Sequence, residues 1–330
     1  MEPLAARSGG GSENLISALP DELLHCILLR LPSVAAAART SLLSRRWRHV
    51  WTHMPELILS CSRPDGGPAP VASVFLDSVD AVLNAYSAPT LRHFEIHMDL
   101  FCRGHLPAHR IARWLQFASR RLAGRLDFYL PMHEDEEDTD RELILPVLER
   151  ATEIKLLLRP NIVLRLPPGG SFTALTDLRI MLSTMNGSEL GRLVSSQCPR
   201  LRKLHVLVKL AVDFDVSIRS KSLVSFFYYA GPGKLEVFTP FLEKISVCQA
   251  TEAYIVAPNL KKVNWHDNAY DPSCHRFAVL SRHLQRLWIN ETSLRLMKPF
   301  DTVNELWLVL SIPECFSNRK IESLGHRLDN

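Results

Sequence analysis

Residues 19–32 read LPDELLHCILLRLP, and this stretch decides how the first part of the chain folds. Pro20 suits the first turn of a helix, where its missing N–H is not needed. Asp21 and Glu22 follow in the same turn and favour the positive end of the helix dipole. Leucine and isoleucine then recur every three or four residues. This spacing predicts a helix that is apolar around more than half of its circumference.

A second segment of the same character follows at residues 42–51, which read LLSRRWRHVW. Between the two lies a short alanine-rich helix, predicted over residues 34–39. Leu43, Trp47 and Val50 give the last segment its own apolar stripe. A module of roughly 40 residues cannot bury this much apolar surface alone. We therefore expect the rest of the chain or another protein to cover part of it.

Beyond a turn-rich break at 61–70 and an amphipathic helix over 71–86, a repeated pattern begins at about residue 91. Each copy reads apolar-x-x-apolar-x-apolar and predicts a short strand whose alternate residues point into the core. The copies begin at Leu91, Ala151, Leu175, Leu201, Leu223, Leu242, Leu260, Leu284 and Val303, with a weaker copy around Leu126. Their spacing is irregular but mostly about twenty to thirty residues, as in repeat proteins. The segments between copies return as helix or loop, with helices expected near 111–123 and 188–196.

The overall composition is that of a folded protein outside the secretory route. Of the 330 residues, 46% are hydrophobic and 22% charged, which is ordinary for a globular chain. The net charge of +4 is spread along the sequence and gives no electrostatic case for nucleic acid. A transmembrane helix is excluded because no run of about 18 apolar residues occurs. The seven cysteines lack zinc-site spacing, so reduced thiols in the cytoplasm and/or nucleus are expected.

The two N-terminal segments together resemble an F-box over residues 17–57, where about ten positions match in order. The resemblance implies a three-helix module that docks on the Skp-type adaptor of an SCF-type cullin–RING ubiquitin ligase. The contact residues that it implies are Leu19, Pro20, Leu23, Ile27, Leu28, Leu31, Pro32, Leu43, Ser44 and Trp47. The alternative is an ordinary helical hairpin packed on its own domain.

The later repeats resemble the divergent leucine-rich repeats that follow the F-box in plant F-box/leucine-rich-repeat proteins, including relatives of FBD type. The phrase APNL at residues 257–260 recurs in that family. The expected fold is α+β, with a small three-helix F-box module followed by an irregular leucine-rich-repeat α/β solenoid. The expected organisation is a flexible leader at 1–16, the F-box at 17–57, a linker and helix at 58–90, and repeats at 91–330.

Candidate chemistry along the chain gives no catalytic constellation. Gly231 and Gly233 begin like a phosphate-binding loop, but Glu236 stands where that loop needs a third glycine. His93 and His97 flank Glu95 on one strand face and could ligate a metal, although an exposed polar repeat face explains them better. The acidic run at 134–140 predicts a solvated loop. We therefore expect a non-enzymatic protein with no cofactor and no metal.

The face of the repeats opposite the core is the candidate binding surface. The third and fifth positions of each copy share this face, and later copies place aromatic rings beside basic groups there, a composition typical of binding hot spots. The predicted substrate-binding residues are Phe227, Tyr229, Arg286, Trp288 and Trp307. Alternatively, these rings pack under the C-terminal tail or a loop.

The favoured function is target recognition for the ligase; the alternative is a repeat scaffold for protein–protein interaction without ligase association. The target protein, and whether a small molecule joins it, stay open.

Overall fold

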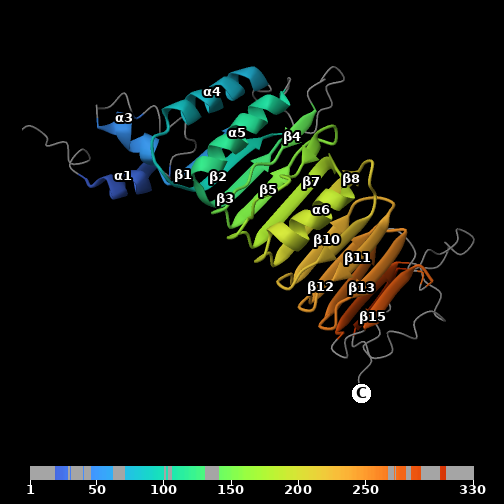
Figure 1. Ribbon diagram of the computed structural model, residues 1–330. Coiled ribbons are helices and arrows are strands. Elements are labelled where there is room, and N and C mark those ends of the chain that lie inside the picture. Colours follow the sequence, from blue (N-terminus) through green and yellow to red (C-terminus); the bar gives the residue numbers. More distant parts are fainter. Residues whose placement is uncertain are drawn as a thin grey trace, which may run out of the picture.

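A computed structural model describes residues 19–28, 30, 40, 46–61, 71–99, 102, 106–130, 141–266, 271, 273–279, 284–290 and 305–309. The dominant feature of this part of the chain is one large parallel sheet, the main sheet (Figure 1). In sheet order its strands are β1 (Glu56–Cys61), β2 (Leu91–Met98), β3 (Leu122–Tyr129), β5 (Glu153–Leu157), β7 (Asp177–Met185), β8 (Lys203–Leu210), β10 (Ser225–Tyr229), β12 (Lys244–Cys248), β14 (Lys262–His266), β16 (Arg286–Asn290) and β17 (Glu305–Val309). The short strands β4 (Glu142–Ile144) and β6 (Val163–Arg165) attach beside β7. Each repeat therefore adds one parallel strand next to the previous one.

Alternate residues of every main-sheet strand form the core, as the repeated pattern predicts. The register aligns one apolar residue per strand in a row that is no more than 2% exposed. This row is Leu57, Phe94, Leu126, Ile154, Leu178, Leu204, Phe226, Ile245, Val263 and Leu287. A second buried row follows two residues later, for example at Ile96, Phe128 and Val206. Removing such rows from water is the dominant stabilising contribution to a parallel sheet.

The main sheet begins before the repeats that the sequence pattern identifies. β1 lies at residues 56–61 and pairs with β2, so the sheet starts at the end of the segment 17–57 expected to be the F-box and continues into the segment 58–90 expected to be linker and helix. Leu57 and Leu59 are buried, but Ile58 between them is also apolar and is 38% exposed, so β1 lacks the apolar-polar alternation that identifies the later strands. The predicted helix between β1 and β2 is present as α4 (Ala72–Ala85).

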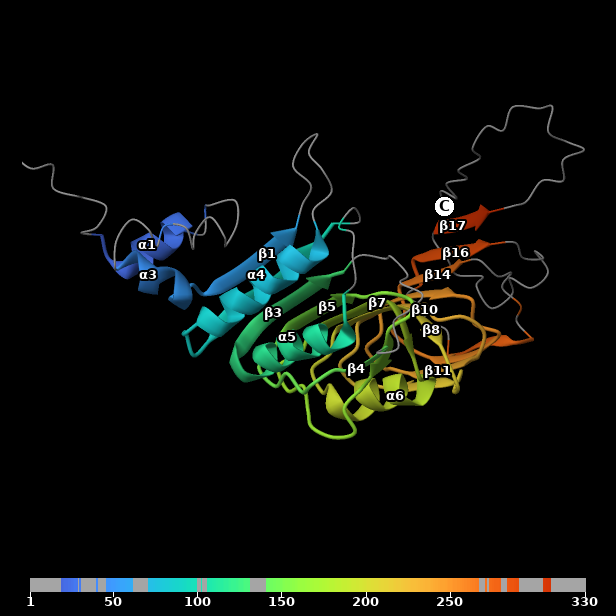
Figure 2. The same ribbon diagram turned by 90° about the horizontal axis from the view of Figure 1, so that it is seen from above.

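Return segments on the outer side of the main sheet change character along the chain. In the first half they include α4, α5 (Ala108–Arg121) and α6 (Gly187–Arg192) with its extension η4 (Leu193–Gln197), as expected near 111–123 and 188–196. In the second half they form a second parallel sheet of four strands, which the sequence analysis did not predict. Its strands are β9 (Val216–Arg219), β11 (Lys234–Phe238), β13 (Glu252–Val256) and β15 (His275–Val279). Figure 2 shows α5, α6 and β11 on the same side of the main sheet.

Repeat length explains this change. The inner residues Phe94 and Leu126 are 32 positions apart, which leaves room for the 14-residue helix α5. From Phe226 to Ile245 and then to Val263 the steps are only 19 and 18 residues. The segment that connects two main-sheet strands in these short repeats must make two turns, which leaves only about five residues between the turns. Those residues alternate apolar and polar side chains, and this alternation favours a strand. None of the helices in the described part of the chain is long and apolar enough to cross a bilayer.

The N-terminal module has a small core of its own. It contains α1 (Asp21–Leu28), α3 (Trp47–Val50) and the 3-10 turn η3 (Trp51–His53), while the predicted alanine-rich helix at 34–39 lies outside the described residues. The buried side chains of this core are Leu24, Leu28, Trp47, Val50, Trp51 and Met54. Arg46 joins α1 to α3, because its Nη2 lies 2.5 Å from Asp21 Oδ1 and 2.6 Å from the Leu19 carbonyl oxygen.

The module is fixed to the first turn of the main sheet. Val82 of α4 packs against the module core. The Tyr86 hydroxyl donates to the Met54 carbonyl at 2.8 Å, and this tyrosine is only 3% exposed. The carbonyl of Thr52 accepts hydrogen bonds from the backbone N–H groups of residues 87 and 88 at 2.9 and 3.2 Å. The module and the sheet are thereby joined by both apolar packing and buried hydrogen bonds.

Gly124 explains why the copy around Leu126 is weak. Strand β3 holds one more residue than β2 between its first and second apolar positions, and the register shifts there. At this bulge the backbone of β3 closely approaches that of β2. A Cβ atom at residue 124 would lie 2.1 Å from the carbonyl oxygen of Arg92. Only glycine fits this approach without movement of the backbone.

We expect Gly124→Ala to destabilise the protein, because the added methyl group must push two paired strands apart. Overpacking of this kind costs about 1–3 kcal/mol, which thermal unfolding followed by circular dichroism would measure. Gly169→Ala is the matched control, since nothing lies within 4 Å of its Cβ position. Equal melting temperatures for the two variants would show that the strands do not approach this closely.

Candidate functional site

The outward face of α1 is the first candidate surface. Pro20 is exposed, and Leu23 and Ile27, one helical turn apart, are 49% and 41% exposed. We call these three residues the α1 strip. Leu24 and Leu28 face the opposite way and are at most 1% exposed. The helix is therefore apolar on two sides, of which the described part of the chain covers one.

The separation of α1 into a buried and an exposed side corrects part of the predicted set of adaptor-binding residues. Leu28 and Trp47 were expected to contact the adaptor, but they are 1% and 4% exposed and fill the module core. A helix that is apolar over a wide arc does not reveal from sequence which side its own chain covers. Leu19 is half-buried against that core. The remaining predicted positions, Leu31, Pro32, Leu43 and Ser44, lie outside the described residues.

The second candidate surface is the face of the main sheet opposite the core, which we call the open face. Parallel pairing aligns its side chains into rows across the strands, and two rows carry most of the functional groups. The first row contains Glu56, His93, Arg125, Glu153, Asp177, Lys203, Ser225, Lys244, Lys262, Arg286 and Glu305. The second row contains Ile58, Glu95, Asp127, Lys155, Arg179, His205, Phe227, Ser246, Asn264, Trp288 and Trp307. The first half of the face is thus ionic, whereas the second is aromatic and basic.

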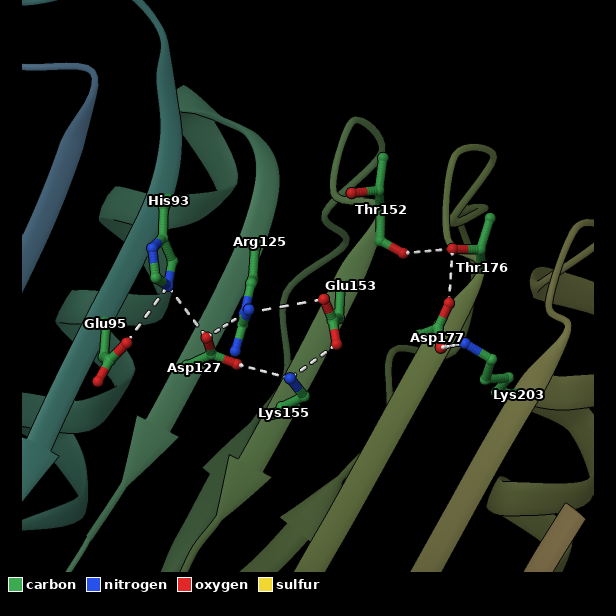
Figure 3. Close-up of polar contacts among 10 residues, drawn as sticks. All are labelled: His93, Glu95, Arg125, Asp127, Thr152, Glu153, Lys155, Thr176, Asp177 and Lys203. Carbon is green, nitrogen blue, oxygen red and sulfur yellow. Dashed lines mark hydrogen bonds and ion pairs between the residues drawn. The ribbon is translucent and has the colours of Figure 1, made fainter. Parts of the chain in front are cut away.

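An ion-pair network centred on Asp127 occupies the first half of the open face (Figure 3). The Asp127 side chain is fully buried, and its Oδ2 contacts Arg125 Nε and lies 3.0 Å from His93 Nε2. Lys155 Nζ is 3.8 Å from the other carboxylate oxygen and 2.7 Å from Glu153 Oε1. Burial raises the pKa of Asp127, but the hydrogen bonds from His93 and Arg125 and the charge of Lys155 outweigh it and hold that pKa below its usual value.

The charges in this network also indicate whether His93, Glu95 and Asp127 form a metal site or a set of ion pairs. His93, Glu95 and Asp127 each offer a ligand atom within 4.8 Å of the others. His97, which the sequence places beside them, is not in this group. Arg125 and Lys155 already supply positive charge to the Asp127 carboxylate, and a metal cation would be repelled by both. The geometry therefore favours a charged structural network over a metal centre.

The sequence analysis did not identify Arg125, Asp127, Glu153 or Lys155 as open-face residues. The bulge at Gly124 displaces the pattern in β3 by one position, so Arg125 and Asp127 could not be assigned to a face by spacing alone. Glu153 and Lys155 follow the ordinary rule and could have been read from the copy that begins at Ala151.

Four of the predicted substrate-binding residues lie on the open face of β10 and β16, and the fifth, Trp307, belongs to β17. Phe227 stacks on His205 with the ring centroids 4.1 Å apart and the planes 7° apart. Burial, together with the charge of Arg179, lowers the pKa of His205 and so favours the neutral form of the stacked ring. Trp288 is 38% exposed and packs edge-on against His266 at 4.5 Å. These contacts fix the orientation of both aromatic rings.

These residues share one face without forming one cluster. Tyr229 lies one row beyond Phe227, and its hydroxyl accepts a hydrogen bond from Gln249 at 2.9 Å. Trp288 lies three strands away from Phe227, or about 14 Å at the usual strand spacing. Arg286 is exposed in the first row, and the backbone of Trp307 pairs with that of Trp288. Any ligand that touches all of them must extend across several strands.

Comparison with known proteins links the chain to plant sequences. The F-box domain model matches residues 16–59. An F-box protein of Arabidopsis thaliana is 34% identical over 133 residues, covering 40% of this chain and 38% of that protein. F-box/LRR-repeat protein 13 of the same plant is 29% identical over 233 residues, 68% of this chain and 48% of that protein. An Arabidopsis F-box/FBD/LRR-repeat protein is 28% identical over 229 residues, 68% of this chain and 49% of that protein.

These matches span less than half of the length of each of those relatives. No solved structure matches the chain.

We expect Asp127→Asn to lower the free energy of unfolding by about 2 kcal/mol at pH 7, because the buried charge-assisted hydrogen bonds are lost. The folded carboxyl has a lowered pKa, so its stabilising contribution is complete above the unfolded pKa of about 3.9. It is lost as the pH falls through the folded value. Urea unfolding at several pH values should therefore show that the two proteins converge in acid.

The control for this prediction is Asp77→Asn, because Asp77 is 70% exposed and pairs with Arg110 at the surface. Its effect should stay within about 0.5 kcal/mol. An Asp127→Asn protein as stable as the wild type at pH 7 would contradict a stabilising role for the network.

Proposed function

We propose that this chain, which carries an F-box domain and is related to the F-box/leucine-rich-repeat proteins of plants, is a substrate-recognition adaptor of an SCF-type cullin–RING ubiquitin ligase. Its N-terminal module docks on the Skp-type adaptor, and its irregular leucine-rich-repeat solenoid binds the target protein. The observation that carries the proposal is the α1 strip, an apolar surface on the module itself that the described part of the chain leaves exposed.

The α1 strip has the chemistry of a docking surface. Full burial of a leucine or isoleucine side chain contributes roughly 1.5–3 kcal/mol. Leu23 and Ile27 are each about half exposed, so covering them contributes roughly half of that amount each. The F-box motif and the observed exposure agree at Pro20 and Ile27. Both residues match the F-box pattern, and both remain exposed to water in the described part of the chain. Such surfaces offset the entropic cost of association.

The repeats contribute position rather than chemistry. The main sheet holds its open face at a fixed place relative to the module through the hydrogen bonds of Thr52 and Tyr86. A target bound to the open face is therefore held near the ubiquitin-charged enzyme that performs the transfer, and proximity accelerates that step. The chain itself forms and breaks no covalent bond in this function.

We expect the double substitution Leu23→Asp and Ile27→Asp to abolish binding to a Skp-type adaptor while the fold persists, because both side chains point to solvent. A pull-down with a purified plant adaptor measures this, with circular dichroism as the check on folding. Val74→Asp on α4 is the matched control, because Val74 is 71% exposed and lies outside the module. A wild-type chain that does not bind the adaptor would favour a repeat scaffold that acts without the ligase.

We also expect Trp288→Ala together with Trp307→Ala to abolish target capture and leave adaptor binding intact, because Trp288 is exposed on the open face of β16 and its backbone pairs with that of Trp307 on β17. The measurement is quantitative affinity purification of ubiquitinated partners with the wild type and the double variant under proteasome inhibition. Phe214→Ala is the control, because Phe214 is 46% exposed and lies outside the main-sheet strands. Unchanged capture by a folded double variant would place the target-binding surface elsewhere.

A further inference from the structure

The second half of the open face carries adjacent positive charges. Lys244, Lys262 and Arg286 occupy the first row on β12, β14 and β16, and each is directly opposite the next in the register. Adjacent strands are about 4.8 Å apart. Like charges in directly opposite positions of a sheet destabilise it. This arrangement therefore has an electrostatic cost that a negatively charged ligand would relieve.

No nearby acid in the described part of the chain forms an ion pair with Lys244 or Lys262, the two lysines of this row. Glu243 precedes Lys244, but its Oε1 lies 2.8 Å from Lys261 Nζ, a lysine outside the row. Asp177 pairs with Lys203 on the far side of β10 at 3.1 Å. Within the described part of the chain, no carboxylate lies within 4 Å of the ammonium group of Lys244 or Lys262. By contrast, acids and bases pair closely across β3 and β5 in the first half of the face.

The neighbouring second row adds apolar groups in a specific order. Phe227 and Trp288 are large, whereas Ser246 and Asn264 between them are short and half-buried. The Asn264 amide donates to the Ser246 hydroxyl at 3.1 Å, so these two short side chains satisfy one another. An apolar side chain from a partner can rest on them with an aromatic ring on either side.

We infer that β10 to β16 of the open face bind an extended acidic segment of a partner protein, with an apolar or aromatic side chain among its acidic residues. Its carboxylates face Lys244, Lys262 and Arg286, and its apolar side chain lies over Ser246 and Asn264. This inference rests on the proposed function for the role of the partner, and it adds the chemical class of the recognised segment.

The dimensions fit an extended chain laid across the strands. Side chains on one side of an extended peptide repeat every 6.4–6.8 Å or so. The three cations span two strand spacings, or about 9.6 Å. Two carboxylates at positions i and i+2 therefore reach the whole row through flexible lysine side chains. Nucleic acid fits the face less well, because acids such as Glu153 and Asp177 share the first row.

The test uses the full-length protein and two fluorescein-labelled twelve-residue peptides. The acidic peptide alternates glutamate with serine around a central tryptophan, and the neutral peptide replaces every glutamate with glutamine. Fluorescence anisotropy at 50 mM salt should give at least tenfold tighter binding of the acidic peptide. The preference should shrink as salt is raised, because screening weakens exposed charge pairs. Equal affinity for the two peptides would overturn the inference.

Two variants locate the binding to this face. Lys244→Glu with Lys262→Glu should remove the tenfold preference, and Asn264→Tyr should weaken binding of both peptides by filling the space over the short side chains. Lys221→Glu is the charge control, because Lys221 is exposed outside the row. A preference that survives the double charge reversal would overturn the inference.

Adaptor binding by the same variants separates this inference from the proposed function. If the wild type binds the acidic peptide but no Skp-type adaptor, ligase association fails and the recognition of acidic segments stands. If the wild type binds the adaptor and shows no preference between the peptides, ligase association stands and the acidic class is wrong.

Discussion

The parallel register of the main sheet is the constraint on which the rest of the structure depends. A single repeat has one strand and too few apolar residues to bury its own inner side. Each repeat is therefore stable only against its neighbours. Because pairing proceeds without interruption from β1 to β17, one side chain from each strand falls into the same row. This alignment buries Phe94, Leu204 and Val263 in one line, and it equally lines up the polar and aromatic groups of the open face.

The parts of this structure that sequence predicts are those encoded in local patterns. The motif around Leu19–Trp47 identifies the N-terminal module, and the repeated apolar spacing identifies the main-sheet strands β2, β3, β5, β7, β8, β10, β12, β14, β16 and β17. Features set by the return path are missed, because periodicity in one strand says nothing about the residues that cross behind it. The second sheet follows from short repeats such as Phe226 to Ile245, and the Asp127 network follows from the bulge at Gly124. Likewise, the pattern of α1 shows that the helix is apolar over more than half of its circumference but not that Leu28 is buried and Ile27 exposed.

The two candidate surfaces differ in how they are supported. The α1 strip lies on a short helix that Arg46 and a core of six side chains hold in place. The open face rests on many strands, and its first half is further fixed by buried charges. The connection between them is short, since Val82 and Tyr86 of the first crossover contact the module directly. In the proposed function, these contacts hold the bound target in a fixed position relative to the bound adaptor, and the described contacts include no hinge between the two surfaces.

The exchange of helices for strands on the outer side has a consequence for shape. Packed helices are about 8–10 Å apart, whereas strands in a sheet are about 4.8 Å apart. Where α4, α5 and α6 cover the sheet, the outer layer is wider per repeat than the inner one, and the layers must bend to stay in contact. Where β9 to β15 cover it, both layers advance by the same distance and the bending force disappears. The difference in spacing therefore favours curvature in the first half of the molecule and removes this cause of bending from the strands that follow β10.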